Sequence, residues 1–167
     1  MSNKIYSQIL YSPNIRLADP KSGLLSKPWG LQLARIVKGG DYHEWDVPED
    51  AKNYWYGKYR LESLINLQCG LENLMIKETF EKVNERSMIS YYYKDEENQD
   101  DVVSVEAIKN MISGLGTSKD NLHEVIFTEV DAHALQSNYF SKDISSVKSE
   151  TENYLQNILG IKKPLDH

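Results

Sequence analysis

Hydrophobic residues follow helical and β-type patterns in an irregular order along this chain, and that order limits the fold more than any other feature. The sequence is 167 residues long, a length that suits one compact domain. Helical and strand patterns mix without the regular strand–helix rhythm of a doubly wound protein. We therefore expect an α+β fold, with a mixed, mainly antiparallel sheet of short strands packed against about three helices, in a single domain spanning residues 1–167.

Residues 1–40 predict a turn-rich β segment. Residues 5–11 and 15–18 are short β-type runs separated by Ser-Pro-Asn, and a third strand is expected over residues 31–37. Four of the five prolines lie at or before Pro48. Because proline lacks an N–H donor and fixes φ, this part of the chain is expected to be irregular.

Residues 61–160 predict helices and strands. Apolar residues at helical spacing indicate a helix over residues 61–83, and a strand is expected over residues 88–93. Ser104 is a suitable N-cap for a second helix, which Gly114 and Gly116 would end. A strand over residues 125–130 and a third helix over residues 144–158 complete the prediction.

The chain is acidic, with a net charge of −6 and a pI near 5.2. Residues 1–40 carry six Lys or Arg against one Asp, whereas the rest holds 13 basic and 24 acidic residues. Direct nucleic-acid binding is disfavoured, because it requires Lys and Arg to neutralise phosphates. Two interpretations of the acidity remain: it keeps the protein soluble, or it attracts a basic protein partner.

The same composition bears on location. No run of about 18 apolar residues predicts a membrane span, and the first residues lack the apolar stretch of a secretory signal. Cys69 is a single cysteine and has no partner for an internal disulfide. We therefore expect a cytoplasmic protein that does not use a membrane as partner.

The aromatic and acidic segment, residues 41–60, has the most unusual composition. Its acidic residues are Asp41, Glu44, Asp46, Glu49 and Asp50, and its aromatic residues are Tyr42, Trp45, Tyr54, Trp55, Tyr56 and Tyr59. Trp and Tyr are enriched in interface hot spots because they bury large rigid surfaces and keep a polar group. Three interpretations stay open: the rings fill the core, form a protein interface, or make a platform for a small ligand such as a sugar.

A second acidic cluster consists of Asp95, Glu96, Glu97, Asp100 and Asp101. A calcium-binding loop is not indicated, because Asp100 stands where that template needs glycine for its sharp turn. The cluster is instead expected to be a solvated loop or a contact patch for a basic partner.

No motif in the sequence indicates catalysis, a cofactor or a metal. His123 and His133 do not have the spacing of a helical zinc pair. Gly114 and Gly116 follow a predicted helix, whereas a phosphate cradle needs glycines before one. Cys69 lies in an apolar helical pattern, where a free cysteine usually behaves as a small hydrophobe.

These features predict a non-catalytic protein-binding protein. In its most concrete form, it is a cytosolic immunity or antitoxin-type inhibitor that neutralises a basic, nuclease-like toxin through an acidic, Trp/Tyr-rich surface. The expected contact residues are Tyr42, Glu44, Trp45, Asp46, Trp55 and Tyr56, and the expected steering patch is Asp95, Glu96, Glu97, Asp100 and Asp101. The alternative is a small enzyme or ligand-binding domain with an aromatic-lined cleft and paired carboxylates.

Overall fold

A three-stranded parallel sheet forms the centre of the computed structural model, which describes residues 5–162. Its strands are β1 (Ser7–Tyr11), β4 (Arg86–Tyr92) and β5 (Leu122–Phe127), in the order β1-β4-β5. In register, Ile9 pairs with Met88, and Tyr91 pairs with Ile126. The central strand β4 is therefore hydrogen-bonded along both edges.

The expectation of a mainly antiparallel sheet is wrong, because all strands of the main sheet run parallel. Antiparallel neighbours can be joined by a tight turn, whereas parallel neighbours need a long crossover. Both links in this chain are crossovers. Residues 12–85 join β1 to β4, and residues 93–121, including a helix, join β4 to β5.

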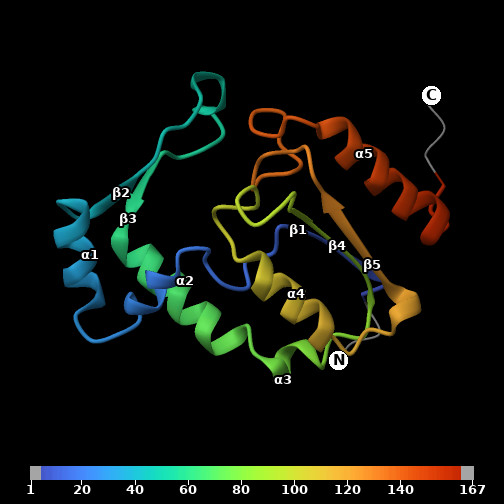
Figure 1. Ribbon diagram of the computed structural model, residues 1–167, viewed down its shortest axis with the longest axis horizontal. Coiled ribbons are helices and arrows are strands. Elements are labelled where there is room, and N and C mark those ends of the chain that lie inside the picture. The colour runs from blue at the N-terminus through green and yellow to red at the C-terminus, as the bar shows by residue number, and fades with distance from the viewer. Residues whose placement is uncertain (1–4, 163–167) are drawn as a thin grey trace.

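Helices cover both faces of this sheet (Figure 1). On one face, α4 (Val105–Gly114) packs Ile108 and Met111 against Ile89 and Tyr91 of β4. On the other face, α5 (Ile144–Asn153) and the π-helical turn Tyr154–Ile158 pack against the alternate residues of β4. Because the side chains of a strand alternate between faces, β4 is buried on both sides, as is usual for a parallel sheet.

The long crossover from β1 to β4 builds a separate lobe beside the sheet, on the left of Figure 1. Its elements are listed in chain order: a 3-10 turn (Pro20–Leu24), α1 (Gly30–Lys38), β2 (Tyr42–Glu44), a 3-10 turn (Glu49–Ala51), β3 (Lys58–Arg60), α2 (Leu61–Leu74) and α3 (Lys77–Phe80). The strands β2 and β3 form an antiparallel hairpin. A further 3-10 turn (Lys119–Asn121) precedes β5. Every helix within residues 5–162 is too short or too polar to cross a bilayer.

The strand expected over residues 31–37 is instead the helix α1. The alternation of Leu31 and Leu33 with polar residues suggested a strand, but the following apolar residues, Ile36 and Val37, fit helical spacing. Gly39 ends the helix in the left-handed conformation, at φ 71°, and the N–H of Gly40 bonds to the carbonyl of Arg35. This is a helix C-terminus of the kind that glycine favours.

Other elements agree better with the sequence. Ser104 is confirmed as the N-cap of α4, because its side chain accepts from the N–H of Ala107. The helix expected over residues 61–83 is divided into α2 and α3, and β5 begins three residues earlier than expected. Of residues 15–18, only Leu17 makes a bridge, to Val103.

A test of this packing uses two glycines at the end of α4. A Cβ at Gly116 would lie 2.4 Å from the carbonyl oxygen of Glu81, whereas one at Gly114 would meet only Phe80, at 3.9 Å. We expect Gly116→Ala to lower the free energy of unfolding by about 1–3 kcal/mol, because backbone must move. Gly114→Ala is the matched control and should be neutral or stabilising in the same denaturant titration. Equal stability of both variants would contradict the close contact between α4 and residues 81–84.

Candidate functional site

Part of the aromatic and acidic segment packs against a distant loop. The ring of Trp55 meets that of Phe140 edge-on at 5.1 Å, and Tyr54 stacks on Tyr139 at 5.5 Å. Trp45 also faces Phe140, at 6.0 Å. These rings therefore join the hairpin lobe to the loop before α5, which is a structural role, although both tryptophans are still exposed on one side.

Two other aromatic residues of the segment remain at the surface. Tyr56 is 89% exposed and is the most accessible of the predicted aromatic contact residues. Tyr42 lies on the hairpin, with the ammonium of Lys58 4.7 Å from the centre of its ring. A partner could reach both rings directly.

Most carboxylates around the hairpin are paired with cations. Asp41 is bonded to Arg35 at 2.7 Å, Glu44 to Lys58 at 2.6 Å, and Glu49 to Lys52. The hydrogen bond from Arg60 lowers the pKa of Glu62 to about 2. These pairs neutralise most of the first acidic cluster.

A shallow cavity of about 330 Å³ beside the hairpin contains the carboxylates of Glu44 and Asp46 together with Trp45. The alternative prediction, an enzyme or ligand-binding domain with paired carboxylates in an aromatic-lined cleft, would place its site in this cavity. Lys58 lines the same cavity and holds Glu44 in an ion pair. The two acids therefore share the cavity with a cation.

The second acidic cluster forms a solvated loop after β4. Asp95 accepts hydrogen bonds from the side chain of Asn98 and from backbone N–H groups, and Glu96 accepts one from Tyr93. Within residues 5–162, no Lys or Arg forms an ion pair with Asp95, Glu96, Glu97 or Asp101, since Lys94 bonds to Glu129 instead. These four residues, called the acidic loop below, keep an unneutralised negative charge.

Asp100 differs from its neighbours because it is buried. One carboxylate oxygen bonds to Nδ1 of His133 at 2.8 Å, and the other accepts the N–H groups of Val102 and Val103 at 3.0 Å. Burial raises the pKa of Asp100, but the hydrogen bond and charge of His133 and the two N–H groups outweigh burial, so the pKa lies below its usual range. Asp100 thus ties two loops together at the carboxyl edge of the sheet.

An aspartate bonded to a histidine is also the orienting part of a catalytic triad. The chemistry needs a nucleophile at the other nitrogen of the ring. Among the described residues, the ring of His133 hydrogen-bonds to Asp100 alone. The same part of the chain contains no group of three or more His, Cys, Asp or Glu placed to hold a metal. The burial of Asp100 and its hydrogen bonds to two backbone N–H groups and to His133 support a structural role for the pair.

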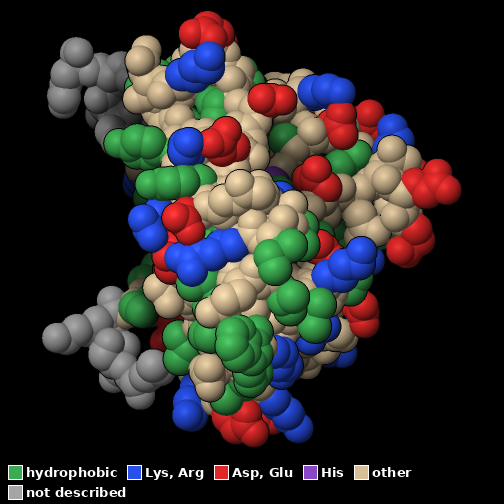
Figure 2. All heavy atoms as spheres, turned by 90° about the vertical axis from the view of Figure 1, so that its left-hand side faces the viewer, with side chains coloured by type: hydrophobic (Ala, Val, Ile, Leu, Met, Phe, Trp, Pro, Cys, Tyr) green, Lys and Arg blue, Asp and Glu red, His purple; other side chains and the backbone are tan. Residues whose placement is uncertain are grey.

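The most unusual surface lies on α1. Trp29, just before the helix, is 73% exposed, and Ile36 and Val37 are 77% and 81% exposed. Leu33, Ile36 and Val37 follow the spacing i, i+3 and i+4, which places them on one helix face, and Trp29 precedes that helix at its N-cap. We call this set (Trp29, Leu33, Ile36, Val37) the apolar stripe. Figure 2, viewed from the α1 side, shows hydrophobic side chains gathered between Lys and Arg on this end of the molecule.

Sequence reasoning missed both of these features. The apolar stripe was hidden by the prediction of a strand, although its spacing and the Gly39-Gly40 pair are a helix signal. The Asp100–His133 pair joins residues 33 positions apart and has no local pattern. His123, in contrast, stacks on Tyr154 at 5.6 Å and lies near the start of β5, whereas His133 lies in the loop after that strand.

Neither a protein-family model nor a curated protein matches this chain. The function must therefore be argued from the surfaces and cavities themselves.

A test of the Asp100 assignment compares two neighbouring aspartates. Asp100→Ala would leave the N–H groups of Val102 and Val103 without an acceptor, and we expect a loss of about 2–4 kcal/mol in the free energy of unfolding. Asp101→Ala removes an exposed carboxylate and should change stability by less than about 0.5 kcal/mol.

The pH dependence of the free energy of unfolding tests whether Asp100 is ionised in the folded protein. Because the pKa of Asp100 is lowered by folding, its contribution is fully present above the unfolded value near 4 and is lost as pH falls through the folded value. The stability gap between wild type and Asp100→Ala should therefore be present at pH 6 and shrink only in acid. A gap that is equal at pH 6 and pH 2 would contradict the ionised, paired state.

Proposed function

We propose that this chain is a non-catalytic protein-binding protein and that the apolar stripe of α1 is its main contact surface. The observation that carries the proposal is the exposure of Leu33, Ile36 and Val37 on one face of a nine-residue helix, next to the exposed ring of Trp29 at its N-cap. Water contact with such a face is unfavourable, and burying a side chain such as Ile or Val contributes about 1.5–3 kcal/mol. Contiguous exposed apolar patches of this kind typically mark interaction sites.

The composition of the surface supports a protein partner. Trp, which occurs at position 29, is among the residues most enriched in interface hot spots. Arg35 and Lys38 lie on the same helix, but Arg35 is already paired with Asp41 and Glu62.

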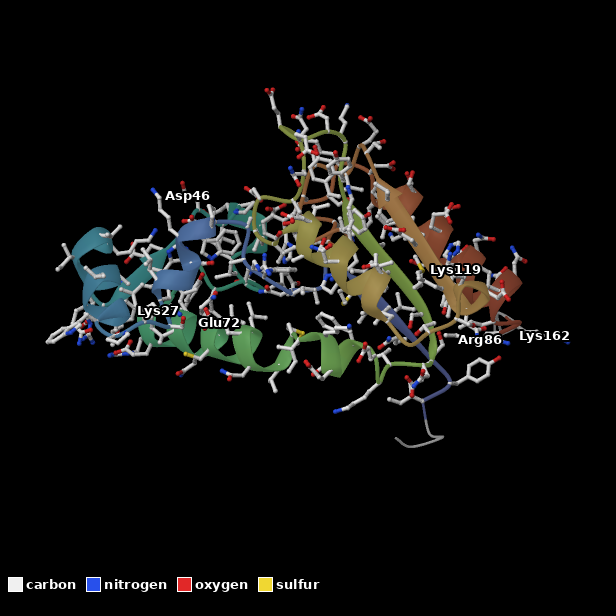
Figure 3. All side chains as sticks on the ribbon, turned by 60° about the horizontal axis from the view of Figure 1, so that its bottom comes forward. Lys27, Asp46, Glu72, Arg86, Lys119 and Lys162 are labelled. Carbon is white, nitrogen blue, oxygen red and sulfur yellow. The ribbon has the colours of Figure 1, made fainter. Side chains whose placement is uncertain are left out.

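The charge distribution supports a basic partner. The acidic loop follows β4 at the carboxyl edge of the sheet, whereas Arg86, at the start of β4, and Lys119 lie at the opposite edge (Figure 3). Lys94, beside the loop, is paired with Glu129, so the loop keeps a net negative field that can speed the approach of a positively charged protein.

In its narrower form, the proposal is a cytoplasmic immunity or antitoxin-type inhibitor of a basic, nuclease-like toxin. Nucleases carry positive surfaces because their substrate is anionic, so an inhibitor gains from carboxylates that take the place of phosphates. The acidic loop supports this form, and Tyr42, Tyr56 and the exposed sides of Trp45 and Trp55 extend the available contact surface. Asp100 is excluded from that surface by its burial.

The test is capture of a partner at low salt followed by affinity measurement with variants of the stripe. Ile36→Asp and Val37→Asp each place a charge in the apolar contact, and we expect each to weaken binding at least ~30-fold, or about 2 kcal/mol. Both positions are exposed, so thermal unfolding should stay within a few degrees of wild type. Leu74→Asp is the matched control: it alters an exposed leucine at the end of α2 and should leave affinity unchanged.

Reversal of charge at Glu97 and Asp101 tests the contribution of the acidic loop separately from that of the apolar stripe. Exchanging both for Lys should slow association and reduce its dependence on salt, with little change in dissociation. A partner that binds both stripe variants as tightly as wild type would overturn the proposed surface. An acidic partner whose binding ignores the acidic loop would overturn the inhibitor form.

A further inference from the structure

The strand β5 lies at one edge of the main sheet, so its outer side has no neighbouring strand within residues 5–162. The carbonyl of Phe127 accepts the N–H of Tyr93, just after β4, so the backbone groups of Phe127 face that strand. Consecutive residues of a strand turn their N–H and C=O groups to opposite sides. The backbone groups of Glu124 and Ile126 therefore point away from the sheet.

These outward groups are unused within the described part of the chain. No described loop or strand hydrogen-bonds to the main chain of Glu124 or Ile126 from the outer side. Both residues are exposed, and the side chain of Ile126 is a large apolar group that is 46% accessible. An open edge of this kind is the template to which an extended peptide adds as a further strand.

A shallow groove of about 250 Å³ lies between this edge and α5, beside β5 in Figure 1. Val125 and Phe127 line it from the strand, and Asp143, Ser146 and Glu150 line it from the helix side. The last three follow the spacing i, i+3 and i+7, which places them on one side of the helix. Because side chains of a strand alternate between faces, a strand added to β5 would direct every second side chain into this groove.

The charge along the groove is mainly negative. Its wall contains Glu129, Asp143 and Glu150 and, among the described residues, no Lys or Arg. Glu129 is paired with Lys94, whereas the only ion-pair contact of Glu150 in the described chain is the ring of His123, at 3.9 Å. The groove therefore keeps carboxylates that a positively charged side chain could pair with.

Glu124 adds a carboxylate on the other face of the same edge. It accepts a hydrogen bond from the hydroxyl of Tyr91 at 2.6 Å, which leaves its charge in place. The cation Lys119 lies before the amino end of β5 and does not line the groove (Figure 3). Both faces of the edge thus match a segment that carries Lys or Arg.

A second copy of this chain is a less favourable occupant of the edge. Pairing of β5 with itself about a two-fold axis would bring Glu124, Glu129 and Glu150 of both copies to one interface. Like charges that face each other across strands are destabilising, whereas a basic segment would pair with them.

We infer that the outer edge of β5 pairs with an extended, Lys- or Arg-containing segment of a partner protein, whose backbone bonds to Glu124 and Ile126 and whose basic side chains reach Asp143 and Glu150. Main-chain hydrogen bonds give the affinity for an extended chain, and the carboxylates give the preference for a basic one. The edge lies at the opposite end of the molecule from α1 (Figure 1), and the inference does not depend on the proposed function.

The test uses the peptide acetyl-Lys-Val-Lys-Val-Lys-Val-amide and amide exchange with water measured by NMR. In the free protein, the N–H groups of Glu124 and Ile126 should exchange rapidly. Saturating peptide should slow both at least ~10-fold, because each then donates to the peptide backbone. Val125 and Phe127, whose N–H groups face β4, are internal controls and should exchange slowly with or without peptide.

A peptide of opposite charge is the matched control. Acetyl-Glu-Val-Glu-Val-Glu-Val-amide has the same length and apolar residues and should bind at least ~10-fold more weakly. Absence of saturable binding of the basic peptide would overturn the inference, as would binding without slower exchange at Glu124 and Ile126, which is charge attraction alone. Slow exchange at both amides in the free protein, with a dimer in sedimentation, would assign the edge to a second copy and overturn it too.

Variants test the contribution of the groove. The double variant Asp143→Asn and Glu150→Gln removes two charges, and it should weaken binding of the basic peptide at least ~3-fold. Asn at position 143 still caps α5, so the helix should be retained. Glu152→Gln, an exposed residue of α5 outside the groove, is the control and should bind as wild type does. Equal affinity for wild type and the double variant would contradict the basic preference of the site.

Discussion

Parallel pairing of β4 on both edges is the constraint on which the rest of the structure depends. Parallel neighbours cannot be joined by a tight turn, so the chain must leave the sheet after β1 and after β4 and return at the other end. The second crossover is short and supplies α4, whereas the first contains the whole hairpin lobe with α1 and α2. Once α4 and α5 cover the two faces, β4 is buried along nearly its whole length. Its serines are accommodated because Ser87 and Ser90 bond to backbone carbonyls. The sheet thus forms the core of the structure, and the lobe is the long connection between β1 and β4.

The lobe carries the surfaces that suggest function. Ion pairs neutralise most carboxylates around the hairpin, and rings of Tyr54 and Trp55 hold the hairpin against residues 139–140. Since these groups are engaged within the molecule, the partner surface that we propose consists of Tyr56 and, above all, α1. There, the side chains of the apolar stripe are 51–81% exposed, while the acidic loop at the carboxyl edge of the sheet keeps its charge.

Local patterns in the sequence predicted some of this structure well. Ser104 indicated the start of α4, the helical spacing of apolar residues from Ile144 indicated α5, and the apolar run near Met88 indicated β4. These predictions succeeded because each signal lies within one element. The direction of the strands depends on pairs such as Ser7 with Arg86, which are 79 positions apart, and single-sequence periodicity contains no information on them. The short apolar run of residues 31–37 fits a strand or a helix until its neighbours are known. Residue types suggested surface roles for Trp55 and Asp100, but only the fold revealed Phe140 and His133 as their partners.

The central claim is that α1 turns its apolar face to water in the free protein. Methyl NMR with a soluble paramagnetic agent tests it directly, because such an agent broadens the signals of methyl groups it can approach. The account predicts strong broadening for the methyl groups of Leu33, Ile36 and Val37 and little for those of Ile89, Ile108 and Val147, which lie in the core. Protection of the α1 methyl groups to the level of the core groups, in a sample shown to be monomeric by sedimentation, would contradict it.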